Sequence, residues 1–218
     1  MKTIKVVPAI IPKSFDELND KIDIVSDFVD TIQIDISDGE FAENITWPYT
    51  EGDELPNHEL PQSDTLKLEL DLYANNPDEV IDAWIEAGVK TVILHLETID
   101  NPSVLIADLK LRDIEIGISI NPSTRSSILD QWIPEINFVQ LMGNDKVGFH
   151  GVELDENVYD KIKELRKKYP KLEIAIDIGV NFETAPKLVK AGATKLISGS
   201  GIFKNKNIPE AIKKLENS

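Results

Sequence analysis

Carboxylates recur at alternate positions within segments that otherwise consist of apolar residues. The clearest are Asp35, Asp71 and Asp177, each of which follows an isoleucine or a leucine. Alternation with period two predicts β-strands in which the polar side chains share one face. Carboxylates that converge from several strands could move protons to and from a carbon atom, or bind a cation. A site of this kind needs a fold that brings the ends of separate strands together.

The strand-like segments are regularly spaced along the chain. The best defined are TIQIDIS (31–37), LKLELDL (66–72), TVILHLE (91–97), EIGISIN (115–121), FVQLMG (138–143) and LEIAIDIG (172–179). Weaker runs near residues 4 and 194 raise the number to eight, and segments with helical periodicity lie between them. With right-handed crossovers, this order predicts a (β/α)8 TIM barrel that forms a single domain over residues 1–218. The competing fold is an open doubly wound sheet, whose central strands would be apolar on both faces.

One stretch interrupts the alternation of strand and helix. Residues 44–65 (NITWPYTEGDELPNHELPQSDT) contain three prolines and a glycine and have no helical period. We therefore expect a long loop in place of the second helix. This loop would begin at the carboxyl end of a strand, which is the face where barrel sites lie.

Asp35 and Asp177 are the candidates for acid–base chemistry. Two carboxylates on opposite sides of one cavity could remove a proton from one face of a carbon atom and return a proton to the other face. The competing interpretation is that both are solvated acids at strand ends, or ion-pair partners of Lys67 or Lys195.

A cation site is a second possibility for the same cavity. Gln33, Asp35, Asp71 and Asp177 could form an oxygen-rich shell, which favours magnesium or manganese over zinc. The chain has no cysteine, so disulfides, thiolate chemistry and sulfur-ligated zinc sites are excluded. The alternative is a hydrogen-bonded polar cavity without a metal. His95, on the same strand face, fits a structural hydrogen bond better than catalysis.

Glycine-rich loops follow the last three strands. They contain Gly148 and Gly151, then Gly179, and finally Gly199 with Ser200. Such loops, where they lead into a helix, form the common phosphate site of these barrels. The same glycines would also fit ordinary tight turns.

The composition narrows the range of partners. The formal net charge is −16, and such a surface repels nucleic acid and anionic membranes. The apolar runs are too short to cross a bilayer, and the first residues show no signal-peptide pattern. We therefore expect a cytoplasmic protein that acts on a small molecule.

Several motifs in order resemble one known family. They are IQIDISDGEFAENIT (32–46) against HxDxMDGxFxPNIT, LELDLYANNPD (68–78) against DVHLMxxNPD, ISINPST (118–124) against LNPxT, AIDIGVN (175–181) against VDGGI, and ISGSGIF (197–203) against AGSAIF. The chain thus resembles the ribulose-phosphate 3-epimerases over nearly its whole length.

The resemblance implies an activity and a set of site residues. In that family two aspartates, which match Asp35 and Asp177, exchange the C3 proton of a ketopentose 5-phosphate through an enediolate beside a bound metal. It also implies a phosphorylated sugar as the substrate and self-association into a homo-oligomer. The residues implied in contacts with the substrate and its phosphate are Met142, Gly148, Gly151, Gly179, Gly199 and Ser200.

The chain departs from the family pattern at the site itself. Gln33 and Asp71 stand where the family has metal-binding histidines, Tyr73 replaces a methionine, and Ile178 replaces a glycine of the phosphate loop. These changes favour a harder cation than zinc, a changed substrate, or loss of the catalytic step. The alternative function is therefore a catalytically inactive phosphosugar-binding or scaffold protein. A lyase or decarboxylase fits least, because 66–72 lacks the Asp-x-Lys-x-x-Asp motif of related barrels.

Overall fold

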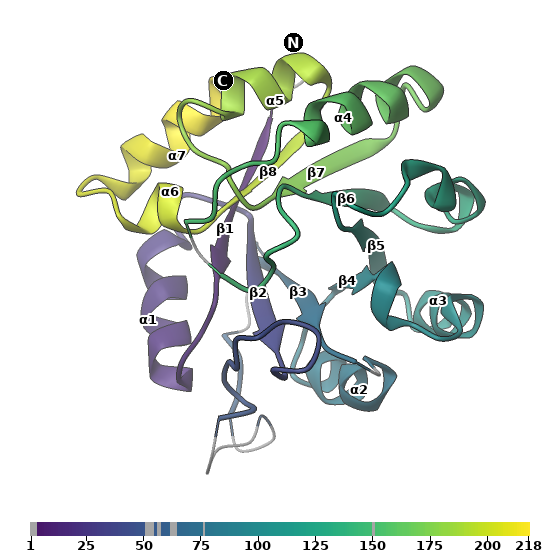
Figure 1. Ribbon diagram of the computed structural model, residues 1–218. Coiled ribbons are helices and arrows are strands. Elements are labelled where there is room, and N and C mark those ends of the chain that lie inside the picture. The colour runs from purple at the N-terminus through teal and green to yellow at the C-terminus, as the bar shows by residue number, and fades with distance from the viewer. Residues whose placement is uncertain (1–3, 51–54, 56–57, 62–64, 76, 150) are drawn as a thin grey trace.

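Eight parallel strands close into a barrel in the computed structural model of the protein (Figure 1). The strands are β1 (Lys5–Ile10), β2 (Thr31–Ser37), β3 (Lys67–Tyr73), β4 (Thr91–His95), β5 (Glu115–Ile120), β6 (Phe138–Met142), β7 (Glu173–Asp177) and β8 (Lys195–Ser198). The structure describes residues 4–50, 55, 58–61, 65–75, 77–149 and 151–218. Each strand pairs with the next, and β8 pairs with β1. The predicted TIM barrel is confirmed.

Helices surround the barrel and join most of its strands (Figure 1). They are α1 (Phe15–Val25), α2 (Asp78–Glu86), α3 (Pro102–Leu111), α4 (Asn157–Lys168), α5 (Ala185–Ala191), α6 (Ser200–Phe203) and α7 (Ile208–Glu216). The described residues also include three short 3-10 helices: η2 (Leu96–Thr98), η3 (Ser126–Gln131) and η4 (Ile133–Glu135). The last two form the connection from β5 to β6, which therefore lacks the α-helix of a regular unit. Within the described residues, none of the helices combines the length and apolar character that a membrane span requires.

The connection between β2 and β3 is a loop, as expected. Its described residues contain no α-helix. Trp47 is fully buried, and its ring meets the ring of Trp84 in α2 edge-on, with 5.9 Å between the centroids. Leu55 and Leu60 are buried in the same apolar cluster. The loop thus covers the outer face of the strands with its own apolar side chains, which explains how the barrel tolerates the loss of a helix.

The inside of the barrel holds charged groups at two levels. The strand register places Gln33 beside Glu69 and Asp35 beside Asp71. Near the amino ends of the strands, Lys195 Nζ donates to both carboxylate oxygens of Glu69 at 2.7 Å. Nearer the carboxyl ends lie the aspartates. The register therefore separates a closed ion pair from a cluster of acids that faces the barrel mouth.

Candidate functional site

Asp35, Asp71 and Asp177 converge at the carboxyl ends of β2, β3 and β7. Their side chains are buried, with exposed fractions of 5%, 0% and 6%. One carboxylate oxygen from each lies within 4.8 Å of the others. The structure thus brings together three residues that are far apart in the sequence. The alternative partners considered for the acids, Lys67 and Lys195, instead pair with Glu115 and Glu69.

Gln33 lies at the centre of these carboxylates. Its Nε2 group is 2.8 Å from Asp35 Oδ1, 3.1 Å from Asp177 Oδ2 and 3.4 Å from Asp71 Oδ2. Its Oε1 atom is buried and has no hydrogen-bond partner among the described residues. A half-turn of the amide would exchange the two atoms and present the oxygen to the carboxylates. Gln33 can therefore link the acids as a donor or join them as a fourth oxygen ligand.

Asp71 is hydrogen-bonded to two side chains outside the acid cluster. His95 Nε2 lies 3.0 Å from Asp71 Oδ1, and Gln140 Nε2 donates to Asp71 Oδ2 at 2.7 Å. All three residues are fully buried. The structure thus gives His95 a hydrogen bond to an acid of the cluster, as the sequence favoured. It also gives Gln140 a role that its sequence position alone did not indicate.

Asp177 is hydrogen-bonded at both carboxylate oxygens. The Ile178 N–H donates to Oδ1 at 2.6 Å, and the Tyr73 hydroxyl donates to Oδ2 at 3.1 Å. Burial and the neighbouring charge of Asp71 raise the pKa of Asp177 to about 6, although these donors and Gln33 oppose the shift. Burial and the charges of Asp177 and Asp71 raise the pKa of Asp35 well above its usual range.

Ile178 has a backbone conformation that is uncommon for a branched residue. Its φ angle is +70°, in the left-handed region that costs a non-glycine residue about 1–2 kcal/mol. The side chain packs in a buried cluster with Met142 and Tyr73. The Ile178 N–H donates to the carboxylate of Asp177, so this amide is part of the acid cluster.

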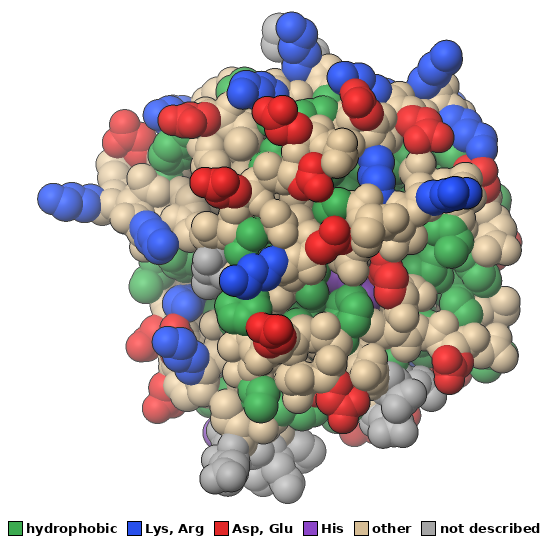
Figure 2. Space-filling view, in the orientation of Figure 1, with side chains coloured by type: hydrophobic (Ala, Val, Ile, Leu, Met, Phe, Trp, Pro, Cys, Tyr) green, Lys and Arg blue, Asp and Glu red, His purple; other side chains and the backbone are tan. Residues whose placement is uncertain are grey.

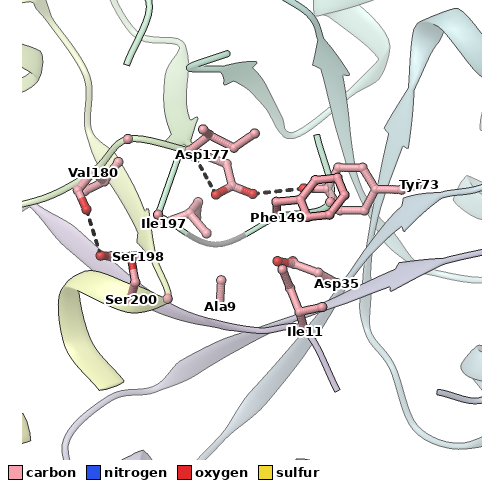
Figure 3. Close-up of a pocket in the computed structure, with 15 residues that line it drawn as sticks. Ala9, Ile11, Asp35, Tyr73, Phe149, Asp177, Val180, Ile197, Ser198 and Ser200 are labelled. Atoms are coloured by element: carbon pink, nitrogen blue, oxygen red, sulfur yellow. Dashed lines mark hydrogen bonds between the residues drawn. The ribbon is translucent and has the colours of Figure 1, made fainter. Parts of the chain in front are cut away.

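A pocket opens above Asp35 and Asp177. Figure 3 shows both side chains projecting into it from β2 and β7, with Tyr73 beside Asp177. Of the residues predicted to contact a phosphorylated substrate, five line this pocket: Gly148, Gly151, Gly179, Gly199 and Ser200. Met142 is fully buried next to Tyr73 and Ile178 and is not among the lining residues. Gln33 and Asp71 are fully buried and likewise do not line the pocket.

The main omission of the sequence interpretation is Tyr73 as a partner of Asp177. The alternation predicts a strand that ends at Leu72, whereas β3 continues to Tyr73. Tyr73 is two positions after Asp71, so the period-two rule places both on the inward face. The rule could not show which acid the hydroxyl would contact.

The acid cluster is suited to a divalent cation. It offers three carboxylates whose oxygens lie close together, and a half-turn of the Gln33 amide would add an oxygen that has no other partner among the described residues. All of these donors are oxygens, which magnesium and manganese prefer. A cation there would also offset the mutual repulsion of three buried negative groups.

Gly179 provides the first prediction from the site. Its φ angle is +75°, and a Cβ atom there would lie 2.7–2.8 Å from Leu154. We expect Gly179→Ala to destabilise the fold by more than about 2 kcal/mol, because a clash adds to the strain of the left-handed conformation. Chemical denaturation measures this change. Gly151→Ala is the matched control, since its φ is +77° but the nearest atom to a Cβ, Lys204 Nζ, is 3.8 Å away. Equal losses for the two variants would contradict the clash.

The raised pKa of Asp177 predicts a pH-dependent stability. An acid whose pKa is higher in the folded than in the unfolded state favours folding when it is protonated. The contribution of Asp177 to the free energy of unfolding is therefore lost as pH rises through about 6. Asp177→Asn removes this titration. The measured quantity is the free energy of unfolding of the variant minus that of the unaltered protein, in the presence of a chelator. This difference should rise by about 1–2 kcal/mol between pH 5 and pH 8. Urea titrations at several pH values measure it, and a pH-independent difference would refute it.

Comparison with known proteins finds a matching family model and similar full-length sequences. The sequence model of the "Ribulose-phosphate 3 epimerase family" matches residues 5–203. A ribulose-phosphate 3-epimerase of Bacillus subtilis (strain 168) is 31% identical, and the match covers 99% of both chains. The chloroplastic ribulose-5-phosphate-3-epimerase of Arabidopsis thaliana is 30% identical over 99% of this chain and 77% of its own.

Solved structures agree with the barrel at lower sequence identity. The tryptophan synthase complex of Pyrococcus furiosus has a chain that matches with a TM-score of 0.67 and 16% identity, covering 100% of this chain and 97% of that one. The 3-hexulose-6-phosphate synthase of Salmonella typhimurium matches with a TM-score of 0.66 and 16% identity, covering 98% and 97%. At this identity the likeness concerns the fold alone.

Proposed function

Because the chain belongs to the ribulose-phosphate 3-epimerase family, we propose that it interconverts ketopentose 5-phosphates at C3, in the manner of ribulose 5-phosphate and xylulose 5-phosphate. The observation that carries this proposal is the position of Asp35 and Asp177. Both are buried carboxyl groups that face one pocket from separate strands (Figure 3). Such a pair can reach a carbon atom between them from two sides.

The two acids have different environments, and this supports complementary roles. The pKa of Asp177 is about 6 and that of Asp35 is raised well above its usual range. At neutral pH the first is mainly an ionised base, whereas burial and the charges of Asp177 and Asp71 favour the protonated form of the second. Two titratable groups whose environments differ can take the roles of acid and base.

The proposed reaction moves one proton off C3 and another onto it. Asp177 removes the C3 proton of one epimer, the electrons of the C–H bond form the C2–C3 double bond, and the π electrons of the C2 carbonyl move to its oxygen to give an enediolate. Asp35 then delivers its proton to C3 from the opposite side as the C2 carbonyl re-forms, which inverts that centre. In the reverse direction the two residues exchange roles, since each step is reversible.

The enediolate carries negative charge next to three carboxyl groups, so the site needs compensating charge. Asp35, Asp71, Asp177 and Gln33 would hold one divalent cation, with magnesium or manganese favoured by their oxygen donors. When bound, this cation would stabilise the negative oxygen of the substrate. Gln33 and Asp71, which do not line the pocket, would serve the ion alone, whereas Asp35 and Asp177 would also face the carbon atom.

The phosphate would bind at the opposite side of the pocket from Tyr73. Ser200 lies on that side in Figure 3. Gly179 and Gly199 also line the pocket, as do Gly148 and Gly151 from the loop after β6. Backbone N–H groups in such loops attract phosphate without a charged side chain. This suits a protein with net charge −16. Figure 2 shows Lys and Arg side chains scattered among Asp and Glu on the visible face rather than gathered together.

The test is epimerisation of D-ribulose 5-phosphate to D-xylulose 5-phosphate. The assay is run after chelation and again after magnesium, manganese or zinc is added back. Turnover that returns best with magnesium or manganese is expected. Turnover that does not depend on added metal would support the two-aspartate mechanism and contradict a requirement for the cation. Absence of both turnover and solvent deuterium at C3 under every condition would refute the epimerase and favour a phosphosugar-binding protein.

A further inference from the structure

We propose that Tyr73 is a positioning residue that fixes Asp177, but not Asp35, for proton transfer at one face of the substrate. The inference rests on the proposed epimerisation and adds a residue that serves only one of its two half-reactions. It follows from the unequal hydrogen bonding of the two acids in the pocket.

The two acids differ in how firmly they are held. Asp177 accepts hydrogen bonds from Ile178 N–H at 2.6 Å, Tyr73 Oη at 3.1 Å and Gln33 Nε2 at 3.1 Å. A carboxylate has about four acceptor positions, so the three donors leave one, on Oδ1, for a substrate proton or a cation. In the described part of the chain, Asp35 accepts from Gln33 alone, at 2.8 Å. Asp177 is therefore fixed in orientation, whereas Asp35 is held at one oxygen.

Tyr73 is itself immobilised and placed at the pocket. Its side chain is 1% exposed, and its ring lies against the ring of His95 with 4.5 Å between the centroids. It packs in a buried cluster with Met142 and Ile178, and it lines the pocket with Asp35 and Asp177. A phenol hydroxyl is protonated at neutral pH and so donates to the carboxylate. Because the ring cannot reorient without repacking, the hydroxyl sets the position of Asp177 Oδ2.

Two of the donors to Asp177 have other functions, and this singles out Tyr73. The Ile178 N–H is part of the backbone, and Gln33 also contacts Asp35 and Asp71. Of the two acids that line the pocket, the Tyr73 hydroxyl bonds to Asp177 and not to Asp35; its other acidic neighbour is Asp71. Loss of this hydroxyl should therefore disturb one acid of the pair and leave the other unchanged.

The experiment measures exchange of the C3 hydrogen with solvent separately for each epimer. The C3 hydrogens of the two epimers lie on opposite faces, so each epimer presents its proton to a different aspartate. Net epimerisation uses both acids and cannot separate them, whereas exchange from one epimer reports one acid. In Tyr73→Phe we expect exchange from one epimer to slow by about 10- to 100-fold, as for loss of a hydrogen bond to a charged group. Exchange from the other epimer should change little.

Two further variants complete the test. Tyr73→Met also lacks the hydroxyl and should show the same selective loss, which keeps the test decisive if either variant folds poorly. Tyr169→Phe is the control, because it removes a similar bond, Tyr169 Oη to Asp130 Oδ1 at 2.7 Å, outside the barrel. It should affect neither epimer.

The outcomes separate this inference from the proposed function. If the unaltered protein exchanges the C3 hydrogen of neither epimer, the epimerase proposal fails, and the role of Tyr73 fails with it. If the unaltered protein exchanges both and the Tyr73 variants slow both equally, or neither, the epimerase stands and the positioning role is wrong. Selective loss at one epimer supports both.

Discussion

Replacing Asp177 with asparagine is expected to lower kcat for C3 epimerisation by about a thousandfold, the usual contribution of a positioned acid or base. The amide has nearly the same shape as the carboxylate but cannot accept the substrate proton. The buried position favours the neutral side chain, because the pKa of Asp177 is already raised by burial and by Asp71. The fold should therefore survive. Steady-state kinetics and thermal unfolding of the purified variant measure the two effects.

Asp71→Asn is the matched control for that experiment. Asp71 lies in the same cluster and is also buried, but it does not line the pocket and is proposed to hold the cation rather than to move the proton. Its loss should raise the magnesium or manganese concentration needed for half-maximal activity and lower kcat less at saturating metal. If Asp177→Asn keeps most of its turnover, the two-aspartate mechanism is wrong. If Asp71→Asn is as inactive at saturating metal, the division of roles is wrong.

Replacing Lys195 with methionine is expected to destabilise the fold by about 3–5 kcal/mol, the range measured when one partner of a buried ion pair is removed. Lys195 Nζ is 2.7 Å from both oxygens of Glu69, and both side chains are almost completely buried. The ammonium group also lies 3.9 Å from the centroid of the Phe138 ring. The variant would leave the carboxylate of Glu69 unpaired inside the barrel. Urea unfolding at neutral pH gives the free energy.

Two comparisons identify the cause of that loss. Adding Glu69→Leu to Lys195→Met removes both charges and should restore much of the stability, because apolar residues can replace a buried pair at little cost. Lys67→Met removes the pair with Glu115 at 3.0 Å, where the side chains are 54% and 45% exposed, and should cost less than about 1 kcal/mol. A double variant no more stable than Lys195→Met would show that lost packing, not the unpaired charge, is responsible.

Much of the fold could be predicted because it depends on local patterns. The period-two alternation of residues 31–37 and 172–179 placed Asp35 and Asp177 on the inward face, and the structure buries both there. The prolines of residues 44–65 predicted a loop, and the described residues of that segment contain no α-helix. The connection from β5 to β6 was less regular than the alternation suggested, since only η3 and η4 form there. Short helical turns have no long apolar period that would reveal them.

The sequence by itself determined which side chains point into the barrel, because the pleat of a strand fixes inside and outside residue by residue. It also determined that the late glycines stand at strand ends. Only the tertiary structure decided which inward groups meet: Gln33 with Asp177, Tyr73 with Asp177, and Lys195 with Glu69. These partners are 144, 104 and 126 residues apart. Their contacts depend on strand register and on closure of the barrel, which are properties of the whole sheet and not of any one segment.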